Sequence, residues 1–231
     1  MKILILSDIH ANAAALAALP QDYDYLLCAG DLVDYGPDPG PCIKFIRERA
    51  KLVVRGNHDQ AVGYRVDCGC GYEYKELSLA SRQWMWQALT GAELDYLRWL
   101  PLDGQVELGG CRFYLTHAVP GDMYHYLEAD ADDDRLRRLT DNIAADVIIW
   151  GHTHKPWMRQ LGDKLIVNPG SVGQPRDGNP LASYALWEDG QIRLMRRKYP
   201  LAQTVRDIKR TPLSHSDQQR LIAILRNGGK S

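Results

Sequence analysis

The sequence has no excess of charge of either sign. Its 231 residues include 28 Lys and Arg and 29 Asp and Glu, which gives a formal net charge of -1 at pH 7. A chain with this balance has no overall electrostatic attraction for nucleic acid or for an anionic membrane. We therefore expect no extended nucleic-acid surface and no membrane partner, and any binding of an anion must depend on a local site.

Cysteines are few, odd in number and scattered, and no long apolar run is present. The chain has five cysteines and starts directly in a short apolar segment without a charged leader. This pattern indicates neither a disulfide framework nor a secretory signal, so we expect a reducing cytoplasm. Cys68 and Cys70 flank a single glycine, but no second cysteine pair or nearby histidine completes a tetrahedral metal site. A turn with two reduced thiols is the favoured interpretation.

What the chain does contain is typical of one globular domain. Its composition is 45% hydrophobic and 25% charged, and it has no repeats, linkers or low-complexity tracts. We therefore expect a single domain over residues 1–231.

Polar side chains follow several apolar runs at the point where each run ends. Residues 2–7 read as a buried strand that leads into Asp8 and His10. Side chains alternate along a strand, so these two point the same way and can bind one metal ion together. Two ligands alone would make a weak site, so further ligands are needed.

The next segments repeat this arrangement. A helix at residues 12–19 and a strand at 25–28 precede Asp31, and a helix at 41–50 and a strand at 51–55 precede Asn57 and His58. Alternating strands and helices predict a parallel sheet, whose strands end along one edge. The side chains that follow these strands should therefore lie together.

The remaining segments predict a second sheet and further helices. Residues 60–72 read as a surface loop, and a hairpin around Gly109 and Gly110 runs into His117. Helices are expected at 74–100, 133–142 and 200–227, and the last four residues should fray. A strand at 146–150 precedes His152 and His154. Short strands at 157–160, 164–167, 183–187 and 191–197 suit a second, more antiparallel sheet that packs on the first.

The helical segment at about 73–101 carries four aromatic side chains, Trp84, Trp86, Tyr96 and Trp99. We expect them to pack against the sheet edge. The alternatives are a partial lid over the site or a contact face of a homo-oligomer.

Eight candidate site residues follow the predicted strands: Asp8, His10, Asp31, Asn57, His58, His117, His152 and His154. This set is too large for one ion with open positions and suits two. Asp31 is the natural bridge, because it has no adjacent partner ligand. Two divalent ions and two aspartates leave a local charge of about +2, which attracts a phosphate ester, and such ions lower the pKa of bound water toward about 7.

The motifs resemble those of the calcineurin-like metallophosphoesterases, in particular the small prokaryotic phosphodiesterase branch. The resemblance rests on Asp8-Ile-His10, Gly30-Asp31-Leu-Val-Asp34, Gly56-Asn57-His58-Asp59, His117 and Gly151-His152-Thr153-His154, and on two loops at residues 34–39 and 168–178. It implies an α/β fold with two packed mixed β-sheets flanked by helices, the four-layer αββα sandwich. The matched motifs and loops run from residue 2 to about 188.

The resemblance also implies a role for each site residue. The first metal would be held by Asp8, His10, Asp31 and His154, and the second by Asp31, Asn57, His117 and His152. His58 would contact the phosphate with Asn57 and protonate the leaving group, and Asp34 would orient His58 and keep it protonated. A loop-capping aspartate is the alternative for Asp34. The family branch often has Gly-Ser after the histidine at position 117, where this chain has Ala118 and Val119.

The sequence thus predicts a binuclear-metal-dependent phosphoesterase, in first place a phosphodiesterase that acts on small esters by attack of a metal-bridging hydroxide. The alternatives are a phosphomonoesterase, a protein phosphatase, or a non-catalytic scaffold of the same fold, like a retromer-type subunit. That scaffold lacks the histidine that this chain retains as His58. The ligand types suit manganese, iron, zinc, cobalt or nickel, and Arg55 and Arg176 are expected near the phosphate.

Overall fold

Two five-stranded sheets form the centre of the molecule in the computed structural model, which describes residues 1–229. The first sheet has the order β10-β9-β1-β2-β3, and its strands span Gln191–Arg197, Ala182–Glu188, Lys2–Leu6, Tyr25–Cys28 and Leu52–Val53. The second has the order β4-β5-β6-β8-β7, with strands Asp103–Leu108, Cys111–Thr116, Val147–Ile149, Lys164–Asn168 and Trp157–Leu161. Each sheet combines three parallel strands with antiparallel neighbours.

Alternation along the strands explains why the two sheets face each other. In β1, Ile3 and Ile5 enter an apolar cluster shared with the second sheet, whereas Leu4 and Leu6 face the helices. In β5, Phe113 belongs to the shared cluster. A strand with both faces buried reads as a continuous apolar run, as residues 3–6 do.

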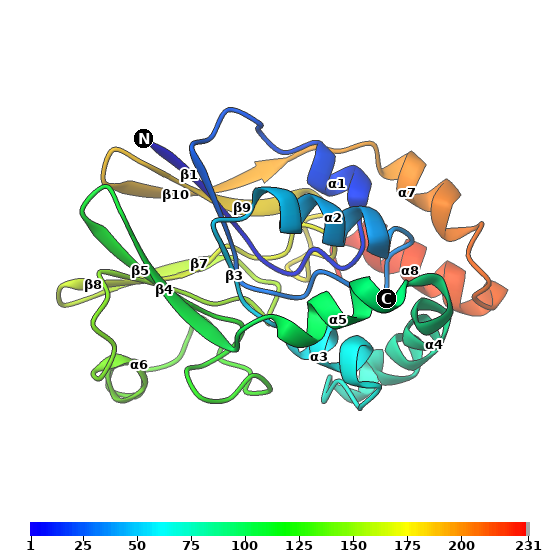
Figure 1. The fold of residues 1–231 in the computed structure, drawn as a ribbon, viewed down its shortest axis with the longest axis horizontal. Helices are drawn as coiled ribbons and strands as arrows, with labels where there is room; N and C mark the ends of the chain where they lie inside the picture. Colours follow the sequence, from blue (N-terminus) through cyan, green and yellow to red (C-terminus); the bar gives the residue numbers. More distant parts are fainter. Residues whose placement is uncertain (230–231) are drawn as a thin grey trace.

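Helices cover the outer faces of the two sheets (Figure 1). Most of them gather on the side of the first sheet, and α6 lies alone beside the second. Their bounds are Ala13–Ala17 (α1), Pro39–Arg49 (α2), Asn57–Tyr64 (α3), Tyr72–Ala88 (α4), Gly91–Trp99 (α5), Asp133–Thr140 (α6), Leu201–Ile208 (α7) and His215–Asn227 (α8). The expected fold of two mixed sheets flanked by helices is confirmed.

Most predicted elements are found, with two corrections. The helices expected near 12–19, 41–50, 74–100, 133–142 and 200–227 are present. The strands at 157–160, 164–167, 183–187 and 191–197 do not form one sheet, because β9 and β10 extend the first sheet and β7 and β8 complete the second. Residues 60–72 are not a continuous loop, since α3 extends to Tyr64.

The end of helix α8 lies beside the loop that follows β8. Gly228 caps the C-terminus of α8, and its carbonyl accepts a hydrogen bond from Gly178 N at 2.8 Å. The expectation that the last four residues fray concerns in part residues 230 and 231, which lie outside the described residues. Within residues 1–229, no helix is both long and apolar enough to cross a membrane.

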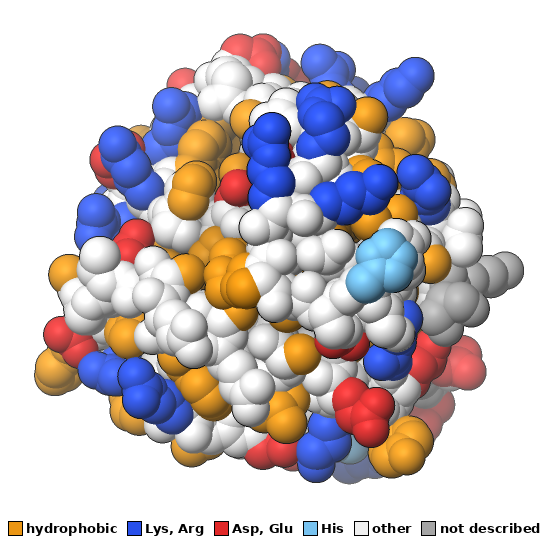
Figure 2. Space-filling view, turned by 90° about the vertical axis from the view of Figure 1, so that its right-hand side faces the viewer, with side chains coloured by type: hydrophobic (Ala, Val, Ile, Leu, Met, Phe, Trp, Pro, Cys, Tyr) orange, Lys and Arg blue, Asp and Glu red, His pale blue; other side chains and the backbone are white. Residues whose placement is uncertain are grey.

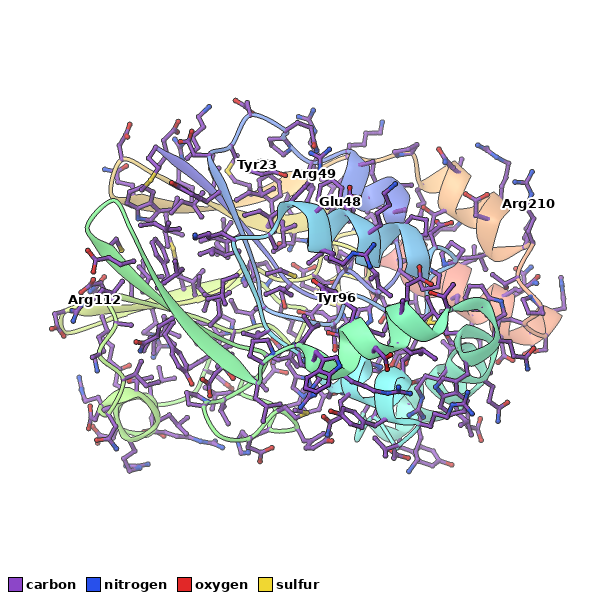
Figure 3. All side chains as sticks on the ribbon, in the orientation of Figure 1. Tyr23, Glu48, Arg49, Tyr96, Arg112 and Arg210 are labelled. Atoms are coloured by element: carbon purple, nitrogen blue, oxygen red, sulfur yellow. The ribbon has the colours of Figure 1, made fainter. Side chains whose placement is uncertain are left out.

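Charges of both signs are spread over the face formed by the helical end of the molecule (Figure 2). Basic side chains are most frequent in the upper part of that view and acidic ones at its lower right, but both kinds occur above and below. Arg210, at the helical end, pairs with Asp207 at 3.3 Å, and Arg112, at the opposite end on the β4–β5 hairpin, pairs with Asp146 at 2.7 Å (Figure 3).

The aromatic side chains of α4 and α5 are divided between the core and the surface. Trp84, Trp86 and Tyr96 pack against the apolar cluster between the first sheet and its helices, and Figure 3 labels Tyr96 there. Trp99, at the end of α5, is 84% exposed. Three of the four therefore pack into the core, and contact with the sheet edge itself stays a prediction.

Candidate metal centre

The carboxyl ends of strands from both sheets bring the candidate ligands together. Asp8 and His10 follow β1, Asp31 follows β2, and Asn57 begins α3 after β3, whereas His117 follows β5 and His152 and His154 follow β6. We expected the first three strand ends, which lead into Asp8, Asp31 and Asn57, to share one sheet, and they do. The three histidines instead come from the second sheet, so the site lies where the two sheets meet.

One set of donor atoms is formed by Asp8, His10, Asp31 and His154. The Nε2 atom of His154 lies 3.1 Å from His10 Nε2 and 3.3 Å from Asp8 Oδ1. Asp31 Oδ2 lies 3.7 Å from His10 Nε2. The four ligand atoms lie within 4.8 Å of one another, so they are able to hold one metal ion.

A second set surrounds Asn57 Oδ1. This oxygen lies 2.9 Å from His117 Nε2 and 3.1 Å from His152 Nδ1. The two histidine nitrogens are 3.2 Å apart, and Asp31 Oδ2 lies 3.3 Å from His117 Nε2. Asp31 Oδ2 thus borders both sets.

Asp31 presents one oxygen that no hydrogen bond satisfies. Its Oδ1 accepts the backbone N–H of His58 at 2.9 Å, whereas its Oδ2 is buried and has no hydrogen-bond partner among the described residues. A buried carboxylate oxygen without a donor is costly unless a cation compensates it. The donor set therefore fits metal ions on both sides of Asp31.

The histidines are held by hydrogen bonds on the ring nitrogen that points away from the donor sets. In each case a backbone carbonyl is the partner: Val33 O for His10 Nδ1 at 3.0 Å, Ala29 O for His117 Nδ1 at 2.8 Å, Gln174 O for His154 Nδ1 at 2.6 Å and Tyr124 O for His152 Nε2 at 3.3 Å. This arrangement fixes the tautomer and aims the other nitrogen's lone pair inward, as in metal-bound histidines.

The turns that carry these ligands have unusual backbone geometry. Five ligand candidates adopt a left-handed conformation, with φ of 54° at Asp8, 45° at His10, 55° at Asp31, 68° at His152 and 60° at His154. This conformation costs about 1–2 kcal/mol per non-glycine residue and is concentrated at functional sites. Close approach also requires glycine at position 56, where a Cβ would lie 2.0 Å from Asp31 Oδ1.

Burial keeps most of the ligand histidines neutral. It lowers the pKa of His10 to about 3 and moves the pKa of His152 and His154 well below the usual range. At His117, burial opposes the charged ring but Asp31 outweighs it and raises the pKa to about 9. Neutral imidazoles are the form that binds metal, so His117 must release a proton when it coordinates.

His58 lies beside the two sets and has a separate partner. It occupies the first turn of α3, and its Nδ1 lies 2.6 Å from Asp34 Oδ2. Burial disfavours the charged ring, but Asp31 and Asp34 outweigh this effect and raise the pKa of His58 to about 9. His58 is therefore protonated at neutral pH and able to donate a proton.

Two side chains that support this arrangement were not singled out as site residues from the sequence. Asp59 accepts hydrogen bonds from Asp31 N and Leu32 N, both at 2.8 Å, and so fixes the turn that carries Asp31. Ser78 of α4 donates a short hydrogen bond to Asp34 Oδ2. Asp59 was visible next to His58, but nothing in the local sequence marks a helical serine as a partner of Asp34.

The two arginines expected near the phosphate differ in position. Arg176 lies over the rings of Tyr74 and Tyr35, with its guanidinium carbon 3.8 Å and 5.8 Å from their centroids, and Tyr35 also contacts His58. Arg55 instead donates to Arg98 O at 2.5 Å. Arg176 therefore borders the site, whereas Arg55 supports the contact between its strand end and α5.

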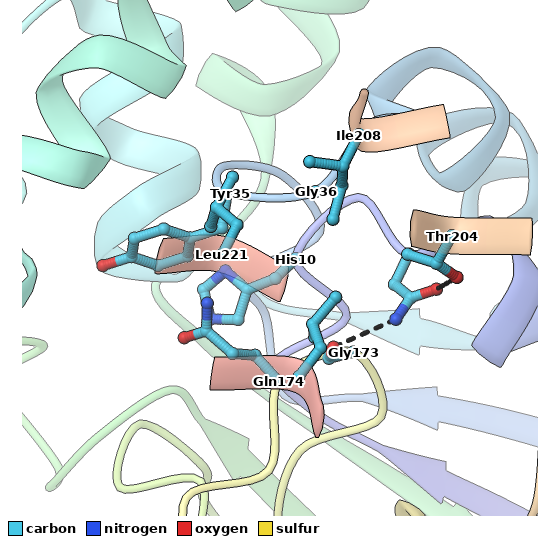
Figure 4. Close-up of a pocket in the computed structure, with 10 residues that line it drawn as sticks. His10, Tyr35, Gly36, Gly173, Gln174, Thr204, Ile208 and Leu221 are labelled. Atoms are coloured by element: carbon cyan, nitrogen blue, oxygen red, sulfur yellow. Dashed lines mark hydrogen bonds between the residues drawn. The ribbon is translucent and has the colours of Figure 1, made fainter. Parts of the chain in front are cut away.

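Helices α7 and α8 close the site from behind (Figure 4). His10, Tyr35 and Gln174 line one side of a cavity of about 10 Å³ there, which has room for no more than one water molecule. Asn12 connects the walls, since its amide donates to Gly173 O at 3.0 Å and its Oδ1 accepts from Thr204 Oγ1 at 3.1 Å (Figure 4). Substrate must therefore approach from another side.

Comparison with known proteins agrees with this geometry. Residues 1–189 match the family model described as the calcineurin-like phosphoesterase superfamily domain. The chain belongs to this superfamily. Members act on phosphate esters with divalent metals, and the donor set around Asp31 fits that chemistry.

Three relatives cover most of this metallophosphoesterase chain. An uncharacterized protein of Methanocaldococcus jannaschii, MJ0912, is 30% identical over 91% of this chain and 93% of its own length. The phosphodiesterase YfcE of Escherichia coli is 28% identical over 82% of this chain and 88% of its own. The crystal structure of a metallophosphoesterase from Sphaerobacter thermophilus superposes with a TM-score of 0.80, at 29% identity and 99% coverage of both chains.

Proposed function

We propose that this protein is a phosphodiesterase that uses two divalent metal ions to hydrolyse small phosphate esters. The single observation that carries the proposal is the unpartnered Oδ2 of Asp31, which lies 3.7 Å from His10 Nε2 and 3.3 Å from His117 Nε2. A carboxylate oxygen between two sets of nitrogen and oxygen donors suits a bridge between two cations. The preference for diesters is supported by the likeness to YfcE.

The proposed ligand sets follow from the two groups of donor atoms. One ion would be held by Asp8, His10, Asp31 and His154, and the other by Asp31, Asn57, His117 and His152. When bound, two divalent ions supply positive charge for the phosphoryl oxygens and lower the pKa of water at the site. Manganese, iron, zinc, cobalt and nickel all suit this mixture of ligands.

The chain's own residues supply the remaining functions. We assign to His58 the protonation of the departing alkoxide, because its ring is protonated at neutral pH and lies next to both ligand sets, with its centroid 5.1 Å from that of His10. Asp34 orients His58 and compensates its charge. Asn57 and His58 contact the phosphate, and Arg176 adds positive charge beside them.

The substrate in this proposal is a small ester and not a long nucleic acid. The formal net charge of -1 supports this choice, as do the mixed charges in Figure 2. We also propose a cytoplasmic location, since all five cysteines are free thiols.

The test is a hydrolysis screen with metal-stripped protein that is reloaded with each of the five ions. We expect bis-para-nitrophenyl phosphate to be hydrolysed faster than para-nitrophenyl phosphate, with two metals per chain by elemental analysis. Faster hydrolysis of the monoester would favour a phosphomonoesterase. A folded, metal-loaded protein that is inactive on every ester with every ion would instead favour the scaffold function.

A further inference from the structure

The turn Cys68-Gly69-Cys70 lies beside His58, and its two sulfurs belong to neither of the proposed ligand sets. The sequence suggested no histidine near this thiol pair, and here that interpretation is wrong. One ring nitrogen of His58 and the Sγ atoms of Cys68 and Cys70 lie within 4.8 Å of one another, and all three residues are buried. Two sulfurs and an imidazole nitrogen form a donor set that the phosphoesterase reaction does not require.

Backbone contacts fix the turn between the two cysteines and the position of Cys68. Gly69 has a φ of 63°, and a Cβ at this position would lie 2.6 Å from the Tyr124 ring, so the turn requires glycine. Cys70 N donates to Cys68 Sγ at 3.4 Å, and Asn57 Nδ2 donates to Cys68 O at 2.7 Å. The N–H group directed at Cys68 Sγ favours a thiolate there.

We propose that His58, Cys68 and Cys70 form a separate site for one soft divalent cation, of the class of Zn²⁺ or Cd²⁺. Thiolates select such ions, whereas the centre around Asp31 offers only oxygen and nitrogen. Tetrahedral zinc with bonds of about 2.3 Å to sulfur needs donors about 3.8 Å apart, so these atoms must approach by up to about 1 Å. Three protein ligands leave the fourth position open, and the two thiols release their protons as they bind.

Occupation of this site removes the proton donor, a consequence that rests on the proposed function of His58. A ring nitrogen that binds a cation carries no proton. If Nε2 binds, the remaining proton is on Nδ1 and faces Asp34 instead of the leaving group. If Nδ1 binds, the ring keeps its Nε2 proton but cannot form the imidazolium, and a neutral imidazole N–H is a far weaker acid. Either geometry makes the third ion an inhibitor.

The experiment adds Cd²⁺ to the Mn²⁺-loaded protein in the presence of a phosphine reductant and compares three proteins. We expect wild type and the matched Cys111→Ala control to show an ultraviolet thiolate-to-cadmium charge-transfer band that saturates at one Cd²⁺ per chain. Cys70→Ala should lack this saturating band. Hydrolysis by wild type should fall about 100-fold at saturation, the scale of a lost proton donor, whereas Cys70→Ala should keep its rate.

The optical and kinetic results test different statements. Absence of the band in wild type, or its persistence at full intensity in Cys70→Ala, overturns the site. Cys70→Ser, which nearly preserves the side-chain volume, replaces alanine if circular dichroism shows that Cys70→Ala is unfolded. A band that depends on Cys70 supports the site even in a protein that hydrolyses no ester, a result that would overturn the proposed function instead. A band without inhibition overturns the acid role of His58.

Discussion

The two sheets contribute unlike halves of the candidate centre. The first sheet carries both carboxylates, Asp8 and Asp31, and leads into the His58–Asp34 pair. The second sheet contributes only histidines, at positions 117, 152 and 154. Both carboxylates therefore lie on one side, together with His10 and Asn57, whereas the other side supplies imidazole alone, and each proposed ligand set is complete only where the sheets meet.

Asp31 is the one residue that belongs to both proposed ligand sets. The first proposed set takes three ligands from the first sheet and His154 from the second, and the other set takes two from each. Asp31 Oδ2 borders both. Loss of this one oxygen should thus disturb both ions, whereas loss of a second-sheet histidine should disturb mainly one.

Asp31→Ala should have the largest effect, because Asp31 borders both ligand sets. We expect no measurable hydrolysis and fewer than two metals per chain, because the change removes the bridge and leaves two cations facing each other. Elemental analysis beside a rate assay checks this. In His154→Ala and His117→Ala the loss should be confined mainly to the first and the second ion respectively. Two metals per chain in Asp31→Ala would contradict the bridging role.

A smaller effect should follow from His58→Ala, which removes a first-sheet residue outside both ligand sets. Alanine retains the backbone N–H that donates to Asp31 Oδ1, so both metals should remain. Hydrolysis should slow by about 100-fold to 10,000-fold, the range for a lost proton donor. Rates with an alkyl and an aryl diester, together with metal content, measure this.

The leaving group provides the control for His58→Ala. An alkoxide needs the proton, whereas para-nitrophenolate is stable without it, so the variant should retain more activity on the aryl ester. Equal losses on both esters would indicate that His58 acts by phosphate contact alone.

The ligand candidates were predictable because their signal is local. An apolar run that ends in Asp, His or Asn marks a strand end, and side-chain alternation puts Asp8 and His10, or His152 and His154, on one side. Parallel strands then bring neighbouring ends together. The sheet to which β9 and β10 belong was not predictable in this way, because a short alternating strand fits the edge of either sheet.

The contacts around His58 were only partly predictable. Asp34 was expected as its partner through the family resemblance, and it lies 2.6 Å from His58 Nδ1. Ser78 and Cys68 reach the same region from α4 and from the turn before it. Their approach depends on how α4 packs, a long-range contact that leaves no mark in the local sequence.

Asp34→Asn should have the smallest effect on the rate. It separates the contribution of Asp34 to the pKa of His58 from that of Asp31. The Asp31 and Asp34 charges together raise the pKa of His58 to about 9 against the effect of burial. A general acid works in its protonated form, so the wild-type rate should fall as pH rises above about 9. Asparagine removes one charge and moves this fall to lower pH. If the pKa returned to its ordinary value of about 6.5, the rate at pH 7 would be about fourfold lower.

Ser78→Ala is the matched control for Asp34→Asn, and pH–rate profiles of both variants provide the measurement. Ser78 also donates to Asp34, but its loss leaves the carboxylate charged and free to accept from His58. The alkaline fall should therefore stay near its wild-type position in Ser78→Ala. If Asp34→Asn left the fall unchanged as well, Asp31 alone would hold the proton on His58. Asp31 would then serve both as the proposed bridge between the metal ions and as the charge that keeps His58 protonated.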